Sequence, residues 1–280
     1  MKDDSIDLAT LEHKQIIPWG QKFVGVSDEN YSKRNVKIAI LDSGINMDHK
    51  DLNGKIKKRF NAINTDENII DDFNHGTAIA GIITANDNDF GIIGIVQNVE
   101  IYDVKVLGEN GTGDVKSLIR GINWAIDQDV DIIHISSGVE TNSVDLEETI
   151  NTAVDRDIII VAAAGNTFGL FVNYPAKYSN VLSISAIDEN LVYLSTSGKG
   201  KIDFSAPGKN IISTNNKGTY EHYSGTSFAT AYATGVIATQ LNKKDINSPN
   251  REILKDLDDN TFKYDTDKPT EMYGKGILIN

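Results

Sequence analysis

The chain has 280 residues, of which 40% are hydrophobic, so it can bury a substantial core as one large domain. It contains no cysteine, which excludes disulfides, thiolate metal sites and a cysteine nucleophile. Its formal net charge of −13 is spread along the chain and argues against nucleic acid or an anionic membrane surface as a partner.

The first 14 residues, MKDDSIDLATLEHK, contain neither a basic n-region nor an apolar h-region. No later window approaches the roughly 20 consecutive apolar residues of a membrane span. We therefore expect no membrane span and a cytoplasmic location. A secreted protein is the alternative, if the chain is the trimmed mature form of a precursor.

Five runs of apolar, β-branched residues predict strands that are covered on both faces. They occupy residues 36–41, 99–107, 130–136, 157–165 and 180–187. Residues 115–128 and 144–156 lie between them and carry apolar side chains at helical spacing. Because strands and helices alternate, we predict an α/β fold with a doubly wound, mostly parallel sheet and helices on both faces. The polar segment from about residue 242 is expected to add loops and a short helix to this domain.

Three polar residues stand beside glycine at the ends of predicted elements. Asp42 follows the first strand in LDSGI, His75 opens the small-residue run HGTAIAGII, and Ser227 precedes FATAYATG, which predicts a tightly packed helix. Each has an ordinary structural explanation, as a turn Asp, a capping His and an N-cap Ser. Together they supply an acid, a base and a nucleophile near the carboxyl edge of the sheet, where α/β proteins place their sites.

The strings DSGI, HGTAIAG and SGTSFAT, in this order, resemble the three signatures of the subtilisin-like serine proteases. The resemblance runs from about residue 15 to the helix after Ser227 and includes IYDVKVLGENGTGDV, INWAI, AAAGN and YPAKY. It implies a serine endopeptidase in which Ser227 attacks the scissile carbonyl, His75 transfers the proton and Asp42 orients the imidazole. Asn166 of AAAGN would donate its side-chain N–H to the oxyanion; a turn Asn is the alternative.

The resemblance also implies that an extended peptide binds as an added strand between two segments of the chain. These are Gly111, Thr112 and Gly113 on one side and Ser136, Ser137 and Gly138 on the other. The S1 pocket would be lined by Ala163, Ala164, Gly165 and Asn173, and the S4 pocket by Val115 and Leu118. The glycine spacing of residues 108–113 is similar to a phosphate loop but lacks the following Lys-Ser/Thr, so nucleotide binding is not favoured.

A structural Ca²⁺ site is implied by the same resemblance. Side-chain oxygens would come from Asp51 and Asn88, and carbonyl oxygens from Asn86, Phe90 and Ile92, with Gln15 completing the set. Ca²⁺ takes six or more oxygen ligands from flexible loops of this kind. An Asx-rich turn that binds nothing explains the loop NDNDFGI equally well.

Some positions depart from the family pattern. Phe228 stands where Met commonly follows the nucleophile, Ala231 and Tyr232 replace Pro-His, and Ser137 replaces a Leu of the substrate strand. These changes alter the expected shape of the pockets and leave the three triad residues intact.

We interpret residues 1–14 as an N-terminal extension or short pro-segment and residues 15–280 as the catalytic domain. The expected partner is a protein or peptide substrate, and the oligomeric state is left open. Two biological roles fit the sequence: general protein turnover, or maturation of one dedicated peptide, as in leader peptidases of lantibiotic clusters. A catalytically silent subtilase fold that serves for binding is the alternative function.

Overall fold

A computed structural model describes residues 6–27, 32–264 and 268–280. Within these ranges a nine-stranded sheet has the order β12-β13-β9-β8-β7-β6-β2-β5-β3. Its strands are β12 (Thr261–Phe262), β13 (Ile277–Leu278), β9 (Phe204–Pro207), β8 (Leu182–Ile187), β7 (Ile159–Ala163), β6 (Ile132–Ile135), β2 (Val36–Asp42), β5 (Val99–Lys105) and β3 (Ile56–Asn61). Neighbouring strands are parallel except β12 and β13. The predicted mostly parallel sheet is therefore confirmed.

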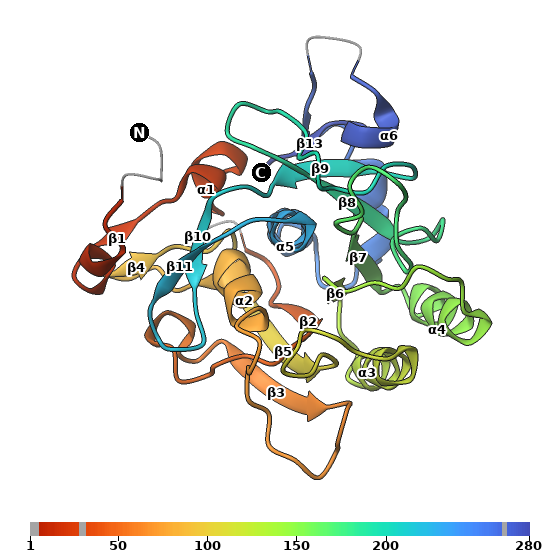
Figure 1. Ribbon diagram of the computed structural model, residues 1–280, viewed down its shortest axis with the longest axis horizontal. Coiled ribbons are helices and arrows are strands. Elements are labelled where there is room, and N and C mark those ends of the chain that lie inside the picture. Colours follow the sequence, from red (N-terminus) through yellow and green to blue (C-terminus); the bar gives the residue numbers. More distant parts are fainter. Residues whose placement is uncertain (1–5, 28–31, 265–267) are drawn as a thin grey trace.

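Helices cover both faces of this sheet (Figure 1). In β2, Ile38 and Ile40 pack into a core with α2 (Gly76–Thr84) and α5 (Thr226–Asn242). Ala39 and Leu41 point the other way, into a core with α3 (Val115–Asp127) and α4 (Val144–Asp155). This alternation follows from the two-residue period of a strand and confirms the doubly wound α/β fold.

The remaining elements are short. The parallel pair β1 (Gln15–Ile16) and β4 (Gly91–Ile92) and the antiparallel pair β10 (Ile211–Thr214) and β11 (Tyr220–Tyr223) form two small sheets. The other helices are α1 (Trp19–Val24), α6 (Thr270–Tyr273) and the 3-10 helices η2 (Leu8–Glu12), η4 (Lys50–Leu52) and η5 (Asn250–Lys255). No helix in the described ranges is long and apolar enough to cross a membrane.

The five predicted strands and the two helices predicted at residues 115–128 and 144–156 are all present, with ends that differ by up to two residues, and the helix predicted after Ser227 is α5. The C-terminal part differs more from expectation. It adds strands β12 and β13 besides loops and α6, and β13 lies parallel to β9. Strand β3 was not predicted either, because apolar and polar residues do not alternate regularly in its sequence IKKRFN. The strand forms a partly exposed edge of the sheet.

The N-terminal segment packs against the rest of the chain where the structure describes it. Leu11 of η2 is fully buried in a small cluster with Ile92, Ile212 and Tyr220. Residues 1–5 of the predicted extension lie outside the described residues. The boundary between residues 14 and 15 stays a prediction.

Candidate active site

Asp42 and His75 form a direct pair at the carboxyl edge of the sheet. Asp42 is the last residue of β2, and His75 immediately precedes α2. His75 Nδ1 lies 2.9 Å from Asp42 Oδ1 and 3.0 Å from Oδ2. Since this nitrogen donates to the carboxylate, the neutral imidazole keeps its proton on Nδ1 and has Nε2 available as a base.

The pKa values of the pair support these roles. Burial raises the pKa of Asp42, but the charge of His75 and hydrogen bonds from His75, Ser136 and the Ser43 N–H outweigh it and hold the pKa at about 2. Burial lowers the pKa of His75, but the negative charges of Asp42 and Asp71 and the hydrogen bond to Asp42 raise it above its ordinary value. Asp42 is therefore ionised throughout the neutral range and stabilises an imidazolium.

Ser227 is the second residue of α5, a helix that is buried on nearly all sides. Its Oγ donates to the carbonyl of Ser136 at 3.2 Å, and the hydroxyl of Ser136 donates to Asp42. Ser136 thus connects the acid with the serine. Within the described ranges no hydrogen bond joins Ser227 to His75; such catalytic bonds are often long without substrate.

Aromatic rings enclose the imidazole on two sides. The Phe73 ring stacks on His75 with a centroid distance of 5.9 Å, and the Phe228 ring lies 5.1 Å away on a tilted plane. Phe228 in turn packs on Tyr223 at 5.0 Å. The departure at Phe228 thus places an aromatic wall against His75, which restricts how the imidazole can tilt.

Asn166 lies beside the start of α5. Its Oδ1 accepts from the N–H of Thr226 at 3.2 Å and from its hydroxyl at 3.3 Å. These two bonds use the amide oxygen of Asn166 and leave its amide nitrogen out. The N–H of Ser227 belongs to the first turn of α5, where helix geometry leaves donors without a partner in the helix.

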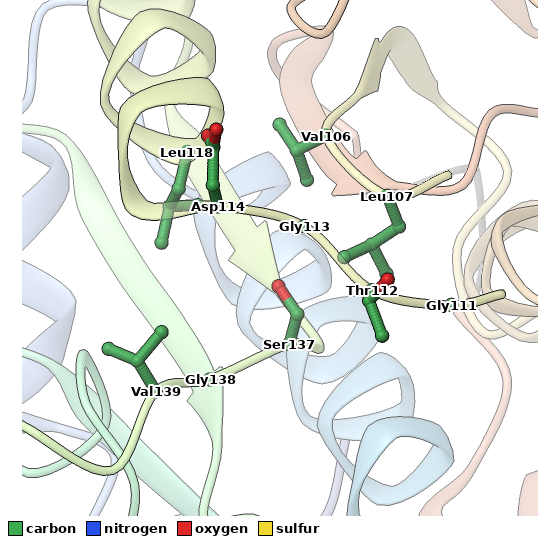
Figure 2. A pocket seen from close by; sticks show the side chains of 10 residues that line it. All are labelled: Val106, Leu107, Gly111, Thr112, Gly113, Asp114, Leu118, Ser137, Gly138 and Val139. Atoms are coloured by element: carbon green, nitrogen blue, oxygen red, sulfur yellow. The ribbon is translucent and has the colours of Figure 1, made fainter. Parts of the chain in front are cut away.

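The two segments predicted to flank a substrate lie on opposite sides of one pocket (Figure 2). The pocket measures about 240 Å³ and is lined by Val106, Leu107, Gly111, Thr112, Gly113, Asp114, Leu118, Ser137, Gly138 and Val139. Of the two residues predicted for S4, Leu118 lines this pocket and Val115 does not; the S4 assignment stays a prediction. Asp114 caps α3 by accepting from the N–H of Ser117 at 2.6 Å.

The residues predicted for S1 gather around Asn173. Its N–H donates to the carbonyl of Ala164 at 3.0 Å, one residue beyond Ala163 at the end of β7. Its side chain fits between two glycines. A Cβ added to Gly138 would lie 2.7 Å from Asn173 Cβ, and one added to Gly165 would lie 2.6 Å from its Nδ2. Larger residues at either glycine would displace Asn173.

A model of the subtilase family matches residues 33–276, which make up most of the chain. The chain belongs to the subtilase family. Subtilisin Savinase from Lederbergia lenta is 34% identical to this subtilase over 268 residues, which cover 94% of the chain and 97% of that protein. Subtilisin E from Bacillus subtilis (strain 168) is 36% identical over 255 residues, covering 86% of the chain and 67% of that protein.

A further relative is considerably longer than this subtilase. The minor extracellular protease Epr of Bacillus subtilis (strain 168) is 39% identical over 248 residues. The match covers 88% of the chain but 38% of Epr, so the chain spans well under half of that protein.

The residues predicted to hold Ca²⁺ are joined by hydrogen bonds. Gln15 Nε2 donates to the carbonyls of Asn86 (2.8 Å) and Ile92 (3.4 Å). The buried Asp51 carboxylate accepts from Asn88 Nδ2 at 2.9 Å and from the N–H of Ile92 at 3.1 Å. The sixth residue, Phe90, donates its N–H to Asn88 Oδ1 at 2.9 Å.

This oxygen-rich set fits Ca²⁺ chemically. It combines one buried carboxylate with amide and carbonyl oxygens. No group of three or more acidic, His or Cys side chains lies together here or at any other place in the described ranges, so a bound ion would rest mainly on neutral oxygens. Burial raises the pKa of Asp51 above its ordinary value, although hydrogen bonds from Asn88, Ile92 and Tyr220 lower it in part. A cation would relieve that cost. Binding one requires the amides of Gln15 and Asn88 to present their oxygens instead of their nitrogens.

Behind the site, a buried histidine occupies β6. His134 Nδ1 lies 3.0 Å from Thr234 Oγ1, and Nε2 has no hydrogen-bond partner in the part of the chain that the structure describes. Burial lowers the pKa of His134 to about 4; the charge of Asp42 raises this pKa and that of His75 lowers it. His134 is therefore neutral in the folded protein at neutral pH.

This histidine predicts an acid-sensitive stability. Because the folded pKa of about 4 lies below the ordinary value of 6.5, protonation favours the unfolded state, and stability is lost as the pH falls from about 6.5 toward 4. Between pH 7.5 and pH 5 we expect the wild type to lose about 2 kcal/mol more unfolding free energy than His134→Asn. Denaturant titrations at both pH values measure the difference. Equal losses in the two proteins would contradict the prediction.

Several residues that lie around Asp42 and His75 were not predicted as site residues from the sequence. Phe73 stacks on His75, and Ser43 donates its N–H to Asp42 at 2.7 Å. Asp71 accepts from the hydroxyl of Ser43, and its charge acts on His75. The only sequence signal for them is their position: Ser43 follows Asp42 directly, and Asp71 and Phe73 lie in DDFN just before His75.

Proposed function

We propose that this chain is a serine endopeptidase that cleaves peptide bonds with Asp42, His75 and Ser227. The observation that carries the proposal is the pairing of His75 Nδ1 with the buried Asp42 carboxylate beside the N-terminus of the helix that bears Ser227. Hydrogen bonds from Ser136 to Asp42 and from Ser227 to the carbonyl of Ser136 support the proposal that the three side chains act together. Membership of the subtilase family supports the same activity.

In the proposed reaction, Ser227 Oγ attacks the carbonyl carbon of the scissile bond. His75 Nε2 takes the hydroxyl proton and then transfers it to the nitrogen of the leaving amine. Asp42 keeps the imidazole in the required tautomer and stabilises its cation, and it stays ionised because its pKa is held at about 2. After the amine has left, water attacks the acyl-enzyme with His75 again as the base, and Ser227 leaves with the proton as the carboxylic acid product is released.

The oxyanion is stabilised by two donors in this scheme. One is the N–H of Ser227 in the first turn of α5, where the helix dipole also favours negative charge. The other is the amide nitrogen of Asn166, whose oxygen is held by Thr226. Donors fixed before the reaction cost no reorganisation when charge develops.

The substrate is proposed to bind as an extended strand between residues 111–113 and 136–138. A Cβ on Gly113 would lie 2.3 Å from the carbonyl oxygen of Val106. Only glycine therefore lets this segment pack so closely against Val106. The pocket of Figure 2 accepts one substrate side chain through its apolar walls of Leu107, Leu118 and Val139. S1 is proposed between residues 163–165 and Asn173.

Incubation with a diverse peptide library, followed by mass spectrometry of the products, tests this function. Cleavage that Ser227→Ala lacks is the expected result. Broad cleavage supports general turnover, and one narrow motif supports maturation of a dedicated peptide such as a lantibiotic leader. An absence of cleavage by the folded wild type would refute the peptidase and support a silent binding fold. The cellular compartment stays a prediction.

We also propose that Ca²⁺ binds at Gln15, Asp51, Asn86, Asn88, Phe90 and Ile92. These residues come from β1, η4 and the loop that ends in β4, three segments far apart in the chain. An ion held by all three would act as a structural cross-link of the folded state.

Calcium should therefore raise the stability of the protein. Saturation at a hundredfold excess over Kd adds about 2.7 kcal/mol if the ion binds only the folded state. We expect a chelator to lower the Tm of the wild type and to leave Asp51→Asn, which loses the only carboxylate of the set, unchanged. Differential scanning calorimetry with and without chelator measures both. An identical wild-type Tm in the two conditions would contradict the site.

A further inference from the structure

Asp71 lies in the loop before α2 and is buried, with 4% of its surface exposed. Both oxygens of its carboxylate are used. Oδ1 accepts from the hydroxyl of Ser43 at 2.7 Å and from the N–H of Asn74 at 2.9 Å, and the N–H of His75 lies 3.4 Å away. Oδ2 accepts from the N–H of Thr77 at 3.0 Å and from its hydroxyl at 2.5 Å.

Ser43 extends this network to the acid of the triad. Its N–H donates to Asp42 Oδ1 at 2.7 Å, and its Oγ accepts from the N–H of Gly76 at 3.0 Å. The residue after Asp42 and the first residues of α2 are therefore tied to one carboxylate. Such charge-assisted hydrogen bonds are shorter and stronger than neutral ones.

We propose that Asp71 is a positioning residue for the triad: it fixes the end of β2, which carries Asp42, to the start of α2, which carries His75, and it places a second negative charge near the imidazole. This inference rests on the proposed peptidase function. Asp71 has no contact with the reacting atoms and acts through Ser43, Thr77 and the backbone of α2.

The effect of the Asp71 charge on the imidazole of His75 can be measured. Asp42, Asp71 and His134 of β6 interact with this imidazole electrostatically. The other titratable groups around this network are Tyr223 of β11, Glu221, which accepts from Asn74, and Lys105, which donates to the carbonyls of Ser43 and Ile70 and pairs with Asp72. Of these, the charges of Asp42 and Asp71 raise the pKa of His75. Because activity requires neutral His75, loss of the Asp71 charge should extend activity to lower pH.

The first experiment compares Asp71→Asn with the wild type and with Asp72→Asn. Asp72 is the neighbouring carboxylate, 45% exposed, and provides a matched loss of charge. For Asp71→Asn we expect a fall in kcat of up to about 10²-fold with little change in KM, since the triad geometry loosens while substrate binding does not. The apparent pKa of kcat/KM should also fall. Asp72→Asn should retain the wild-type kcat and pKa.

A second variant separates position from charge. Ser43→Ala removes the hydroxyl that joins Asp71 and the N–H of Gly76, but it keeps the Asp71 carboxylate. We therefore expect kcat to fall while the apparent pKa of kcat/KM stays unchanged. If Asp71→Asn does not fold, Ser43→Ala and Thr77→Val, which each remove one link, decide the positioning role. Wild-type kcat in these two variants, or wild-type kcat and pKa in a folded Asp71→Asn, would overturn the proposal.

NMR titration of the His75 imidazole provides a readout that needs no activity. In the Ser227→Ala background we expect a lower His75 pKa when Asp71→Asn is added and no change when Asp72→Asn is added. If the wild type cleaves no peptide, the proposed function fails, whereas this titration still tests the charge of Asp71. An unchanged imidazole pKa in Asp71→Asn would refute that part of the proposal.

Discussion

Ser227→Ala should lower kcat by about 10⁶-fold, the loss that removal of the corresponding serine causes in subtilisin. The variant keeps the helix start, because Ser227 contributes no side-chain cap to α5 and only a 3.2 Å bond to the carbonyl of Ser136. The protein should therefore fold as the wild type does. Its loss of turnover would reflect the missing nucleophile, measured as cleavage of a short peptide together with the Tm.

Ser224→Ala is the matched control for this change. Ser224 lies three residues earlier, is exposed, and accepts through Oγ from the N–H of Asn210 at 3.0 Å. We expect it to retain the wild-type kcat. A Ser227→Ala protein that cleaves peptides at more than a small fraction of the wild-type rate would show that another group is the nucleophile.

Asn166→Ala should lower kcat by about 10²–10³-fold with little change in KM, as loss of the oxyanion asparagine does in subtilisin. The reason is that the amide nitrogen stabilises charge that exists only in the transition state. Asn166→Asp is a sharper variant. It retains an oxygen to accept from Thr226 but replaces the donor by an acceptor, so the same or a larger loss is expected.

The control for this site is Asn180→Ala, an exposed asparagine that donates to Asn151 at 3.2 Å. Its kcat and KM should match the wild type. Steady-state kinetics on one peptide substrate for all three variants separates the effects on kcat and KM. Near wild-type kcat in Asn166→Ala would remove Asn166 from the oxyanion site.

Much of the fold could be predicted because its signals are local. The run VKIAIL is continuous and apolar since β2 is buried on both faces, and the small residues after Ser227 reflect a helix buried on nearly all sides. Strands β3 and β13 lack such a signal. β3 is a partly exposed edge strand with charged residues, and β13 contributes two residues whose place beside β9 depends on the rest of the sheet.

The sequence by itself determined the fold class, the family and the candidates Asp42, His75 and Ser227, since each stands in a string that its own neighbours define. The tertiary structure alone decided which neighbouring side chains serve the site. Asp71 and Asp72 are adjacent and chemically identical, yet one is buried in a network with Ser43 and Thr77 and the other is half exposed. That difference arises because the loop before α2 packs against the end of β2, a contact between segments almost 30 residues apart in sequence. Burial, hydrogen bonding and electrostatic influence on His75 all follow from that contact, and no local pattern encodes it.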